Sequence, residues 1–492
     1  MTARRTRAAN LADRSGHRAR GALRLHFASW ELSPFAQTGG LGDAAGGLAR
    51  ALAARGHEVA CILPAHRDVL RHPACPELVP AGAVSVAGVA GRWLAGESDG
   101  IQLWLLDLPT LYDRPQLYGG ADVAEALRYI AFARATAALA ASHRPQLLVA
   151  HDWHAALALT VLRTGHDFGA ARAVGTVQVV HNNAFLGRFP AASFAATGLP
   201  DSLFHPDALE FWGDLALLKG GVVFADRIVA VSPNYAAELQ TPAFGAGLEG
   251  LYAVRAHRLL GIVNGIDTQR NDPASDPTLP ARFSADYPKP KGACRQALLD
   301  ATGLDAPEPG RLLAAIGRLA AQKGWDVLVA ALPKLVSAGA SLVLLGDGDP
   351  AIAELLRDAA ARWPKRVHVA IGWDDAFARR SYAGADCVLA PSRFEPCGLV
   401  QLLAQRYGAL PIAHRVGGFV DTIDDGTTGI LFAPLTPDAI AAAVDRAVAL
   451  FAKQGALAVQ RALLEVDVSW AQPAVAWERV LAGAAREAAR RI

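Results

Sequence analysis

Several loops of this sequence combine glycine with polar or charged side chains in a way that suits an anion or a sugar. The first, residues 37–43, reads Gln-Thr-Gly-Gly-Leu-Gly-Asp and leads into a helix. Bare amides at a helix start, together with the helix dipole, favour anions or sugar hydroxyls. The same glycines match a dinucleotide fingerprint, but the following strand ends in Pro64 instead of the acid that would hold a ribose. This loop alone is therefore a weak signal.

Two later loops carry basic side chains next to glycine. Gly317-Arg318 follows an apolar strand, and Gln322-Lys323-Gly324 opens the next helix. Arg318 and Lys323 can neutralise a diphosphate, because arginine offers a planar fork of donors and lysine a point charge. A solvated loop with two ordinary bases is the other interpretation.

A carboxylate and two more glycines follow further along the chain. The segment 391–399, Pro-Ser-Arg-Phe-Glu-Pro-Cys-Gly-Leu, places Glu395 at the start of a predicted helix that extends to Gly408. A carboxylate is stabilised at a helix N-terminus, so Glu395 either binds sugar hydroxyls or is a simple helix-end charge. The segment 414–419 repeats the order of strand, Gly-Gly and helix start, which predicts a second helix end suited to anions.

Aromatic and histidine side chains also come directly after strands. Trp373 is either a stacking surface for a base or a core residue. His181 is either a structural residue or a functional one. His151 and His154 could suggest a metal, but the glutamate of the H-E-x-x-H motif and a third ligand are missing, so a hydrogen-bonding role is favoured.

Such loops need a scaffold that gathers strand ends, and the chain repeats strand, loop and helix throughout. These units build parallel sheets with helices on both faces, and such sheets bind ligands beyond the carboxyl ends of their strands. The predicted strands are 23–30, 57–63, 146–150, 175–180, 227–231, 311–316, 341–345, 368–371, 387–390 and 410–413.

The length of 492 residues predicts two domains, because a single core rarely grows past roughly 250–300 residues. We expect a basic leader at 1–22, an N-terminal doubly wound α/β domain at 23–259 and a second one at 260–469. A final helix at 470–492 is expected to cross back to the first domain. Residues 267–290, rich in Asp, Pro and Ser, are the best linker candidate.

Composition excludes several classes of protein. The chain has 48 basic and 46 acidic residues without a basic stripe, which argues against a nucleic-acid binder. No uncharged apolar run reaches the roughly 18 residues of a membrane helix. The five scattered cysteines fit reduced thiols in a cytosol better than disulfides or a zinc site. The Arg-rich leader is either a transit peptide, which would point to a plastid, or a disordered segment.

Taken together, these segments resemble the bacterial glycogen synthases and plastid starch synthases, over nearly the whole chain from about Leu23. The resemblance rests on many short matches in order and at reasonable spacing. They are 37–43, 112–115, 151–154, 181–182, 218–221, 230–235, 264–268, 317–324, 391–399, 407–408 and 417–418.

The resemblance implies the GT-B fold, two doubly wound Rossmann-like domains facing a deep cleft. It implies a cytoplasmic transferase that moves glucose from ADP-glucose to the non-reducing end of an α-1,4-glucan, such as glycogen or a malto-oligosaccharide, with retention and without metal or cofactor. The implied catalytic residues are His181, Arg318, Lys323 and Glu395. The implied donor-binding residues are Gln37, Gly39, Gly40, Asp43, Asp152, Asn264, Trp373, Cys397, Gly398, Leu399, Gly417 and Gly418.

The sequence departs from the family in ways that bear on the donor and the acceptor. Gln37 replaces the family lysine, and the loop 181–189 lacks the usual Tyr-Gln pair. Leu403 stands where many other retaining glycosyltransferases have a second glutamate, and no carboxylate is an obvious nucleophile, so a same-face internal return mechanism is expected. Three other functions stay open: a glucosyltransferase with another donor or a small acceptor, a catalytically weak glucan-binding protein, and more remotely a NAD-dependent oxidoreductase.

Overall fold

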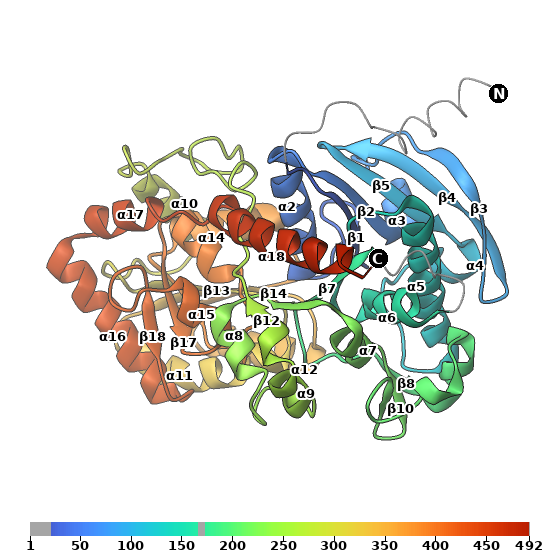
Figure 1. The fold of residues 1–492 in the computed structure, drawn as a ribbon. Coiled ribbons are helices and arrows are strands. Elements are labelled where there is room, and N and C mark those ends of the chain that lie inside the picture. Colours follow the sequence, from blue (N-terminus) through green and yellow to red (C-terminus); the bar gives the residue numbers. More distant parts are fainter. Residues whose placement is uncertain (1–20, 166–172, 492) are drawn as a thin grey trace. The chain divides into compact units, whose positions relative to one another are not determined.

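The structure is a computed structural model that describes residues 21–165 and 173–491 (Figure 1). The leader expected at 1–22 lies outside the described residues except for its last two positions. The chain divides into two compact units. Unit 1 comprises the described residues up to Val231, Ala236–Asn264 and the segment from Trp470 onward, and unit 2 comprises Ser232–Tyr235 and Gly265–Ser469.

Unit 1 is built on a nine-stranded sheet in the order β12-β11-β7-β6-β1-β2-β5-β4-β3. The first seven strands in this order are parallel, and β4 and β3 add an antiparallel edge. The strands are β1 (Arg24–Ala28), β2 (Glu58–Pro64), β3 (Val79–Val86), β4 (Val89–Ser98), β5 (Ile101–Asp107), β6 (Leu147–His151), β7 (Gly175–Val180), β11 (Arg227–Ala230) and β12 (Leu259–Gly261). Because β12 pairs with β11, residues 260–264 stay with unit 1, and the expected boundary at 259/260 shifts to Asn264/Gly265.

Helices and a small sheet complete unit 1. A three-stranded sheet, which the sequence reading did not include, joins β8 (Arg188–Pro190), β10 (Asp214–Ala216) and β9 (Glu210–Phe211). The α-helices are α2 (Gly40–Ala54), α3 (Arg67–Arg71), α4 (Pro109–Tyr112), α5 (Val123–His143), α6 (Asp152–Thr164), α7 (Leu217–Phe224), α9 (Glu249–Val254) and α18 (Ala471–Ala489). The short helix α8 (Pro233–Glu238) is divided between the two units.

The C-terminal helix α18 belongs to unit 1 although it follows unit 2 in the chain. It packs against α2 and β7 (Figure 1). Trp477 is buried on its inner face. On its polar side Glu478 accepts two hydrogen bonds of 2.8 Å from Arg55, and Glu487 accepts one of 2.6 Å from Arg227. These contacts fix the end of the chain to the first sheet.

Unit 2 is a second doubly wound unit, with a fully parallel sheet in the order β15-β14-β13-β16-β17-β18. The strands are β13 (Leu312–Ile316), β14 (Ser341–Gly346), β15 (Val367–Ile371), β16 (Cys387–Ala390), β17 (Leu410–His414) and β18 (Ile430–Phe432). The helices are α10 (Lys291–Thr302), α11 (Trp325–Ser337), α12 (Pro350–Arg362), α13 (Asp375–Gly384), α14 (Val400–Arg406), α15 (Gly417–Thr422), α16 (Pro437–Gln454) and α17 (Ala456–Leu464).

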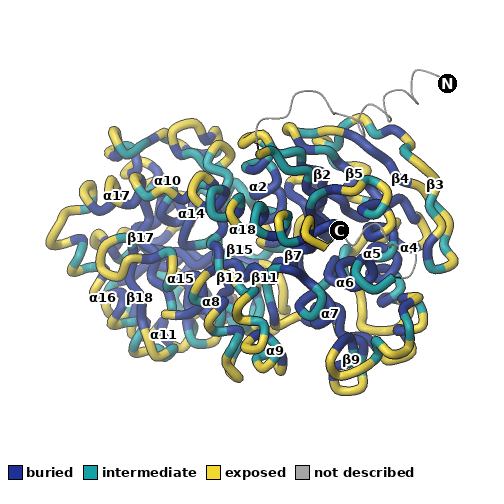
Figure 2. The backbone as a smooth tube through the Cα atoms, in the orientation of Figure 1, coloured by how far each residue is buried: buried dark blue, intermediate teal, exposed yellow. Residues whose placement is uncertain are grey.

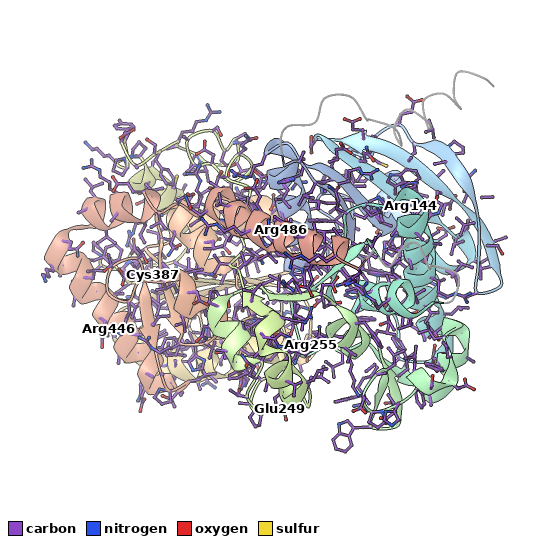
Figure 3. The ribbon with its side chains drawn as sticks, in the orientation of Figure 1. Arg144, Glu249, Arg255, Cys387, Arg446 and Arg486 are labelled. Carbon is purple, nitrogen blue, oxygen red and sulfur yellow. The ribbon has the colours of Figure 1, made fainter. Side chains whose placement is uncertain are left out.

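The central strands of both sheets are apolar and buried, as parallel strands covered on both faces should be. Figure 2 shows β7 in dark blue, and every residue of β7 is buried. Cys387, labelled in Figure 3, starts the fully buried strand β16, and all five cysteines are free thiols. Residues 267–290 do not form a free linker, because Leu279 and Phe283 pack into the core of unit 2.

In each sheet the strand order reverses at one place, and ligands of open α/β sheets bind at such switch points. The reversal lies between β1 and β6 in unit 1 and between β13 and β16 in unit 2. Among the described residues, none of the helices combines the length and apolar character that crossing a lipid bilayer requires.

Candidate functional site

The candidate residues fall into two groups, one in each unit, and each group follows the carboxyl ends of several strands, including those that flank the switch point. In unit 1 the glycine loop follows β1. Helix α2 starts at Gly40, and its N-cap Gly39 has no side chain to cap the first turn. The amides of this turn are therefore left without a side-chain acceptor, as the predicted anion or sugar site requires.

Glu31 fixes the glycine loop through hydrogen bonds to its side chain. Its buried carboxylate accepts hydrogen bonds from the amide and hydroxyl of Thr38, at 2.8 and 2.7 Å, and from the hydroxyl of Tyr118. The sequence reading missed Glu31 and Tyr118. Glu31 lies three residues after the end of a strand, and this position could have identified it as a candidate site residue. Gln37 is exposed, and its amide donates to the carboxylate of Asp43 at 2.5 Å.

Asp152 joins the ends of β6 and β7. Its carboxylate accepts the amides of His181 and Asn182 at 2.9 and 3.2 Å. The backbone of Asp152 is in the left-handed region, at φ 58°, and the buried amide of Gln178 donates to its carbonyl at 3.2 Å. Burial raises the pKa of Asp152 to about 7. A strained, buried carboxylate with a raised pKa at a strand end is typical of a functional position.

His181 is half-buried, and its Nε2 lies 3.0 Å from Nδ1 of His151. Burial lowers the pKa of His181 to about 3, so the imidazole is neutral at pH 7. The His154 ring lies against Trp153, with centroids 3.9 Å apart. Within 21–165 and 173–491, no three or more His, Cys, Asp or Glu side chains are grouped as a metal site would need.

In unit 2, Lys323 and Glu395 form the centre of the candidate site. The Lys323 ammonium lies 2.6 Å from Oε2 of Glu395, which also accepts the Ser392 hydroxyl at 2.9 Å. The other oxygen, Oε1, has no partner in the described part of the chain. This carboxylate is held at one oxygen and has the second one available for a ligand. A small, mostly apolar pocket at the ends of β13 and β16 is lined in part by Lys323 and Ser392, the two side chains that bond to Glu395.

A clamp between two loops brings these side chains together. Arg393 binds both carboxylate oxygens of Asp326, at 2.9 and 2.6 Å, and its amide donates to the carbonyl of Gln322 at 2.8 Å. Gly324 lies against Pro391 so closely that a Cβ would be 2.0 Å from the Pro391 carbonyl oxygen, and its φ of 69° favours glycine. The sequence predicted both loops but not the clamp.

Glu395 itself lies in a loop and not at a helix start, because α14 begins only at Val400 and ends at Arg406. Cys397, Gly398 and Leu399 therefore precede the helix, with Leu399 as its N-cap. The charge of Glu395 is balanced by Lys323 and not by a helix dipole. This corrects the prediction that Glu395 lies at a helix N-terminus.

The two glycines at the start of α15 are used for close packing. A Cβ on Gly417 would lie 1.9 Å from the carbonyl oxygen of Glu395, and the amide of Gly418 donates to the same oxygen at 3.0 Å. The Gly418 amide is thus engaged within the protein, which differs from the expectation that it faces a phosphate.

Three remaining candidates differ in exposure. Arg318 is exposed and has no side-chain partner among the described residues. Trp373 is 61% exposed, so it is not a core residue and its ring is free to stack. Asn264 is buried at the end of the unit 1 segment that follows β12.

Comparison with known proteins agrees with this arrangement. The family model described as the starch synthase catalytic domain matches residues 24–254, and the one described as glycosyl transferases group 1 matches residues 310–449. A glycogen synthase of Methylocella silvestris is 42% identical, covering 93% of this chain and 98% of that protein. A glycogen synthase of Thermus thermophilus is 41% identical, covering 93% and 98%.

Solved structures give the same result. The catalytic domain of starch synthase IV from Arabidopsis thaliana, bound to ADP and acarbose, superposes with a TM-score of 0.87 at 27% identity, covering 94% of this chain and all of that one. A sucrose-phosphate synthase from Thermosynechococcus elongatus, with a TM-score of 0.59 at 19% identity, covers 93% and 98% and shares the fold.

The two family models, together with the two doubly wound units and the solved relatives, identify a glycosyltransferase of the GT-B fold. The chain belongs to the glycogen synthase family, which confirms the resemblance and the fold class predicted from the sequence.

Proposed function

We propose that the protein transfers glucose from ADP-glucose to the non-reducing end of an α-1,4-glucan with retention at the anomeric carbon. The observation that carries the proposal is the Lys323–Glu395 pair of 2.6 Å beside a pocket at the unit 2 switch point. The pair supports the proposal, because Lys323 would neutralise the diphosphate and the second oxygen of Glu395 would accept from glucose hydroxyls. The ADP and acarbose bound to the related starch synthase support the donor and acceptor classes.

The reaction creates charge that the proposed residues can stabilise. When the bond between the glucose C1 and the diphosphate oxygen breaks, the leaving ADP gains negative charge. Arg318 and Lys323 would stabilise it by preorganised charge. Trp373 would stack on adenine, and the glycine loop, Gln37 and Asp43 would lie near the donor.

The proposal also assigns residues to the glucose that is transferred. The neutral His181 would lie beside the reacting glucose, with Asp152 and Asn264 lining its site, and Glu395 would accept from glucose hydroxyls. In the internal return that we propose, the acceptor oxygen bonds to C1 on the face that the diphosphate leaves. The acceptor proton passes to the leaving diphosphate oxygen, so no enzyme carboxylate forms a bond to the sugar. Isolation of a glucosyl ester on a carboxylate of the native enzyme would contradict this mechanism.

A comparison of donors tests the proposal. Purified protein is incubated with glycogen and either labelled ADP-glucose or labelled UDP-glucose at equal concentration, without added metal. We expect faster incorporation from ADP-glucose, and unchanged incorporation in the presence of a chelator. A clear preference for UDP-glucose would replace the donor in this proposal. We further propose that the protein acts in the cytoplasm, as expected for a protein with five free thiols.

A further inference from the structure

Phe185 presents an aromatic ring to the surface from a loop that is firmly held. The side chain is 54% exposed, whereas its neighbours Asn183 and Leu186 are only 1% and 7% exposed. A residue between two buried anchors has little freedom to turn inward or outward. The exposure of Phe185 is therefore a property of a fixed loop.

Hydrogen bonds of Asn183 provide the first anchor. Its amide nitrogen donates to the carbonyls of Phe244 and Gly245, at 3.3 and 2.8 Å, and its oxygen accepts the hydroxyl of Tyr252 at 2.7 Å. Buried hydrogen bonds of this kind fix a backbone, because breaking them leaves polar groups unsatisfied. The side before Phe185 is thus tied to α9 and the loop that precedes it.

The second anchor follows Phe185 directly. At Gly187 the chain adopts a φ of 63° and lies over Trp153, with a Cβ position only 2.4 Å from the indole ring. The carbonyl of Gly187 accepts the amide of Leu217 at 3.1 Å. The chain then enters β8.

A tight turn places Phe185 close to the candidate sugar site of unit 1. The amide of Phe185 donates to the carbonyl of Asn182 at 3.3 Å, and the Asn182 side chain accepts the amide of Ala184 at 3.1 Å. Such a four-residue turn keeps its first and last Cα atoms within about 7 Å. Asn182 and His181 both donate their amides to Asp152, so the backbone that carries the exposed Phe185 ring lies within one turn of these groups.

The surroundings of Phe185 suit a neutral sugar and not a nucleotide. His181 is neutral, the amides of His181 and Asn182 donate to Asp152, and Arg188 further along the loop is paired with Asp214 at 2.7 Å. A flat apolar ring beside a few polar groups is the pattern by which pockets orient ligands with apolar faces. Glucose units of a glucan have such faces formed by their C–H groups.

We propose that Phe185 is the stacking surface for a glucose unit of the acceptor glucan. The inference rests on the proposed function and names a residue that sets affinity for its acceptor. Because the ring lies on the acceptor side, its removal should weaken glucan binding and leave the ADP-glucose contacts intact.

The test compares Phe185→Ala, Phe185→Leu and Phe185→Tyr in the full-length protein. We expect Ala and Leu to raise the KM for maltoheptaose about tenfold, the size expected for one aromatic contact. Tyr, which keeps the flat ring, should retain the wild-type value, and the KM for ADP-glucose should stay unchanged in all three. Trp212→Ala is the matched control, because Trp212 is a 79% exposed aromatic on another turn of unit 1.

Equal acceptor KM values for wild type and Phe185→Ala would overturn the inference, as would a rise in KM for ADP-glucose alone. Calorimetric titration of maltoheptaose into each variant without donor separates this inference from the proposed function. If the wild type transfers no glucose but binds maltoheptaose, and Phe185→Ala loses this binding, the proposed function fails while the acceptor surface stands.

Discussion

At the scale of single residues, the Lys323–Glu395 pair is the part of the site that the sequence predicted only as two separate side chains. The sequence places both residues after predicted strands. Because strand ends in a parallel sheet meet at one edge, the two side chains are expected near each other. The sequence could not show that the two charges pair at 2.6 Å or that Ser392 binds the same oxygen. Those contacts depend on loops 72 residues apart in the chain.

Because the two side chains act as one unit, their substitutions should not be additive. We expect Lys323→Ala and Glu395→Gln each to lower kcat about 100-fold or more, the size seen for a lost electrostatic stabiliser. The double variant should be little slower than either single variant. Steady-state kinetics of the wild type, the two single variants and the double variant measure these losses of kcat. A loss in the double variant equal to the product of the two single losses would show that the residues act independently.

Asp152 gives the reaction a pH dependence. Its pKa is raised to about 7, so the carboxylate becomes protonated as the pH falls through 7. If the anion binds glucose hydroxyls, kcat/KM should decline below this pH. Asp152→Asn keeps an oxygen for the amides of His181 and Asn182 but cannot titrate, so its kcat/KM should be lower and flat over the same window. A wild-type profile that is flat from pH 6 to 8 would show that Asp152 does not titrate in the reaction.

At the scale of elements, the close approach of two loops depends on Gly324. We expect Gly324→Ala to displace Pro391 and lower kcat, because a Cβ would meet the Pro391 carbonyl at 2.0 Å. Gly303 is the matched control, since its φ of 67° is nearly the same as the 69° of Gly324 but no atom lies within 4 Å of its Cβ position.

Both variants should lose stability by about 1 kcal/mol from the left-handed backbone, and only Gly324→Ala should lose activity beyond that. Urea unfolding and kinetics of the pair separate strain from displacement. Equal kcat values for the two variants would show that the clamp tolerates the shift.

Most strands that the sequence reading found have a mostly apolar run, but β5, which has one as well, was missed. Strand β7 and strand β16 have the predicted bounds, since fully buried parallel strands are mostly apolar along their whole length. The edge strands β3 and β4 mix buried and exposed residues and were missed. The three short strands β8, β9 and β10 are two or three residues long, which is too short for a periodic signal.

At the scale of the whole molecule, buried histidines should set the stability at low pH. Burial lowers the pKa of His26, His66 and His181 to about 3, whereas it raises that of Asp152 to about 7. Burial also lowers the pKa of His151 and His154 well below the ordinary value. Between about pH 4 and 6.5, unfolding lets these five histidines bind protons and lets Asp152 release one. Since the unfolded state then holds more protons than the folded state, the free energy of unfolding should rise with pH in this window.

Denaturant unfolding at several pH values measures this slope. His66→Phe removes one of the protons, so its slope should be lower by roughly 1.4 kcal/mol per pH unit. Identical slopes for wild type and His66→Phe would show that His66 also titrates normally in the folded protein.

Two compact units were predictable from the chain length and the repeated strand and helix pattern, whereas that pattern gives no reason for the last helix to return to the first sheet. The position of the division at Asn264/Gly265 was not predictable from the sequence, because β12 is only three residues long and carries little signal of its own.

The central claim is that this molecule transfers glucose from ADP-glucose to a glucan. The most direct measurement is the incorporation of labelled glucose from ADP-glucose into glycogen by the native protein, with the Lys323→Ala, Glu395→Gln double variant as background. The account predicts incorporation well above this background, with the label removed by an exo-acting enzyme specific for α-1,4 bonds. Native, folded protein that gives no incorporation above the double variant would contradict it.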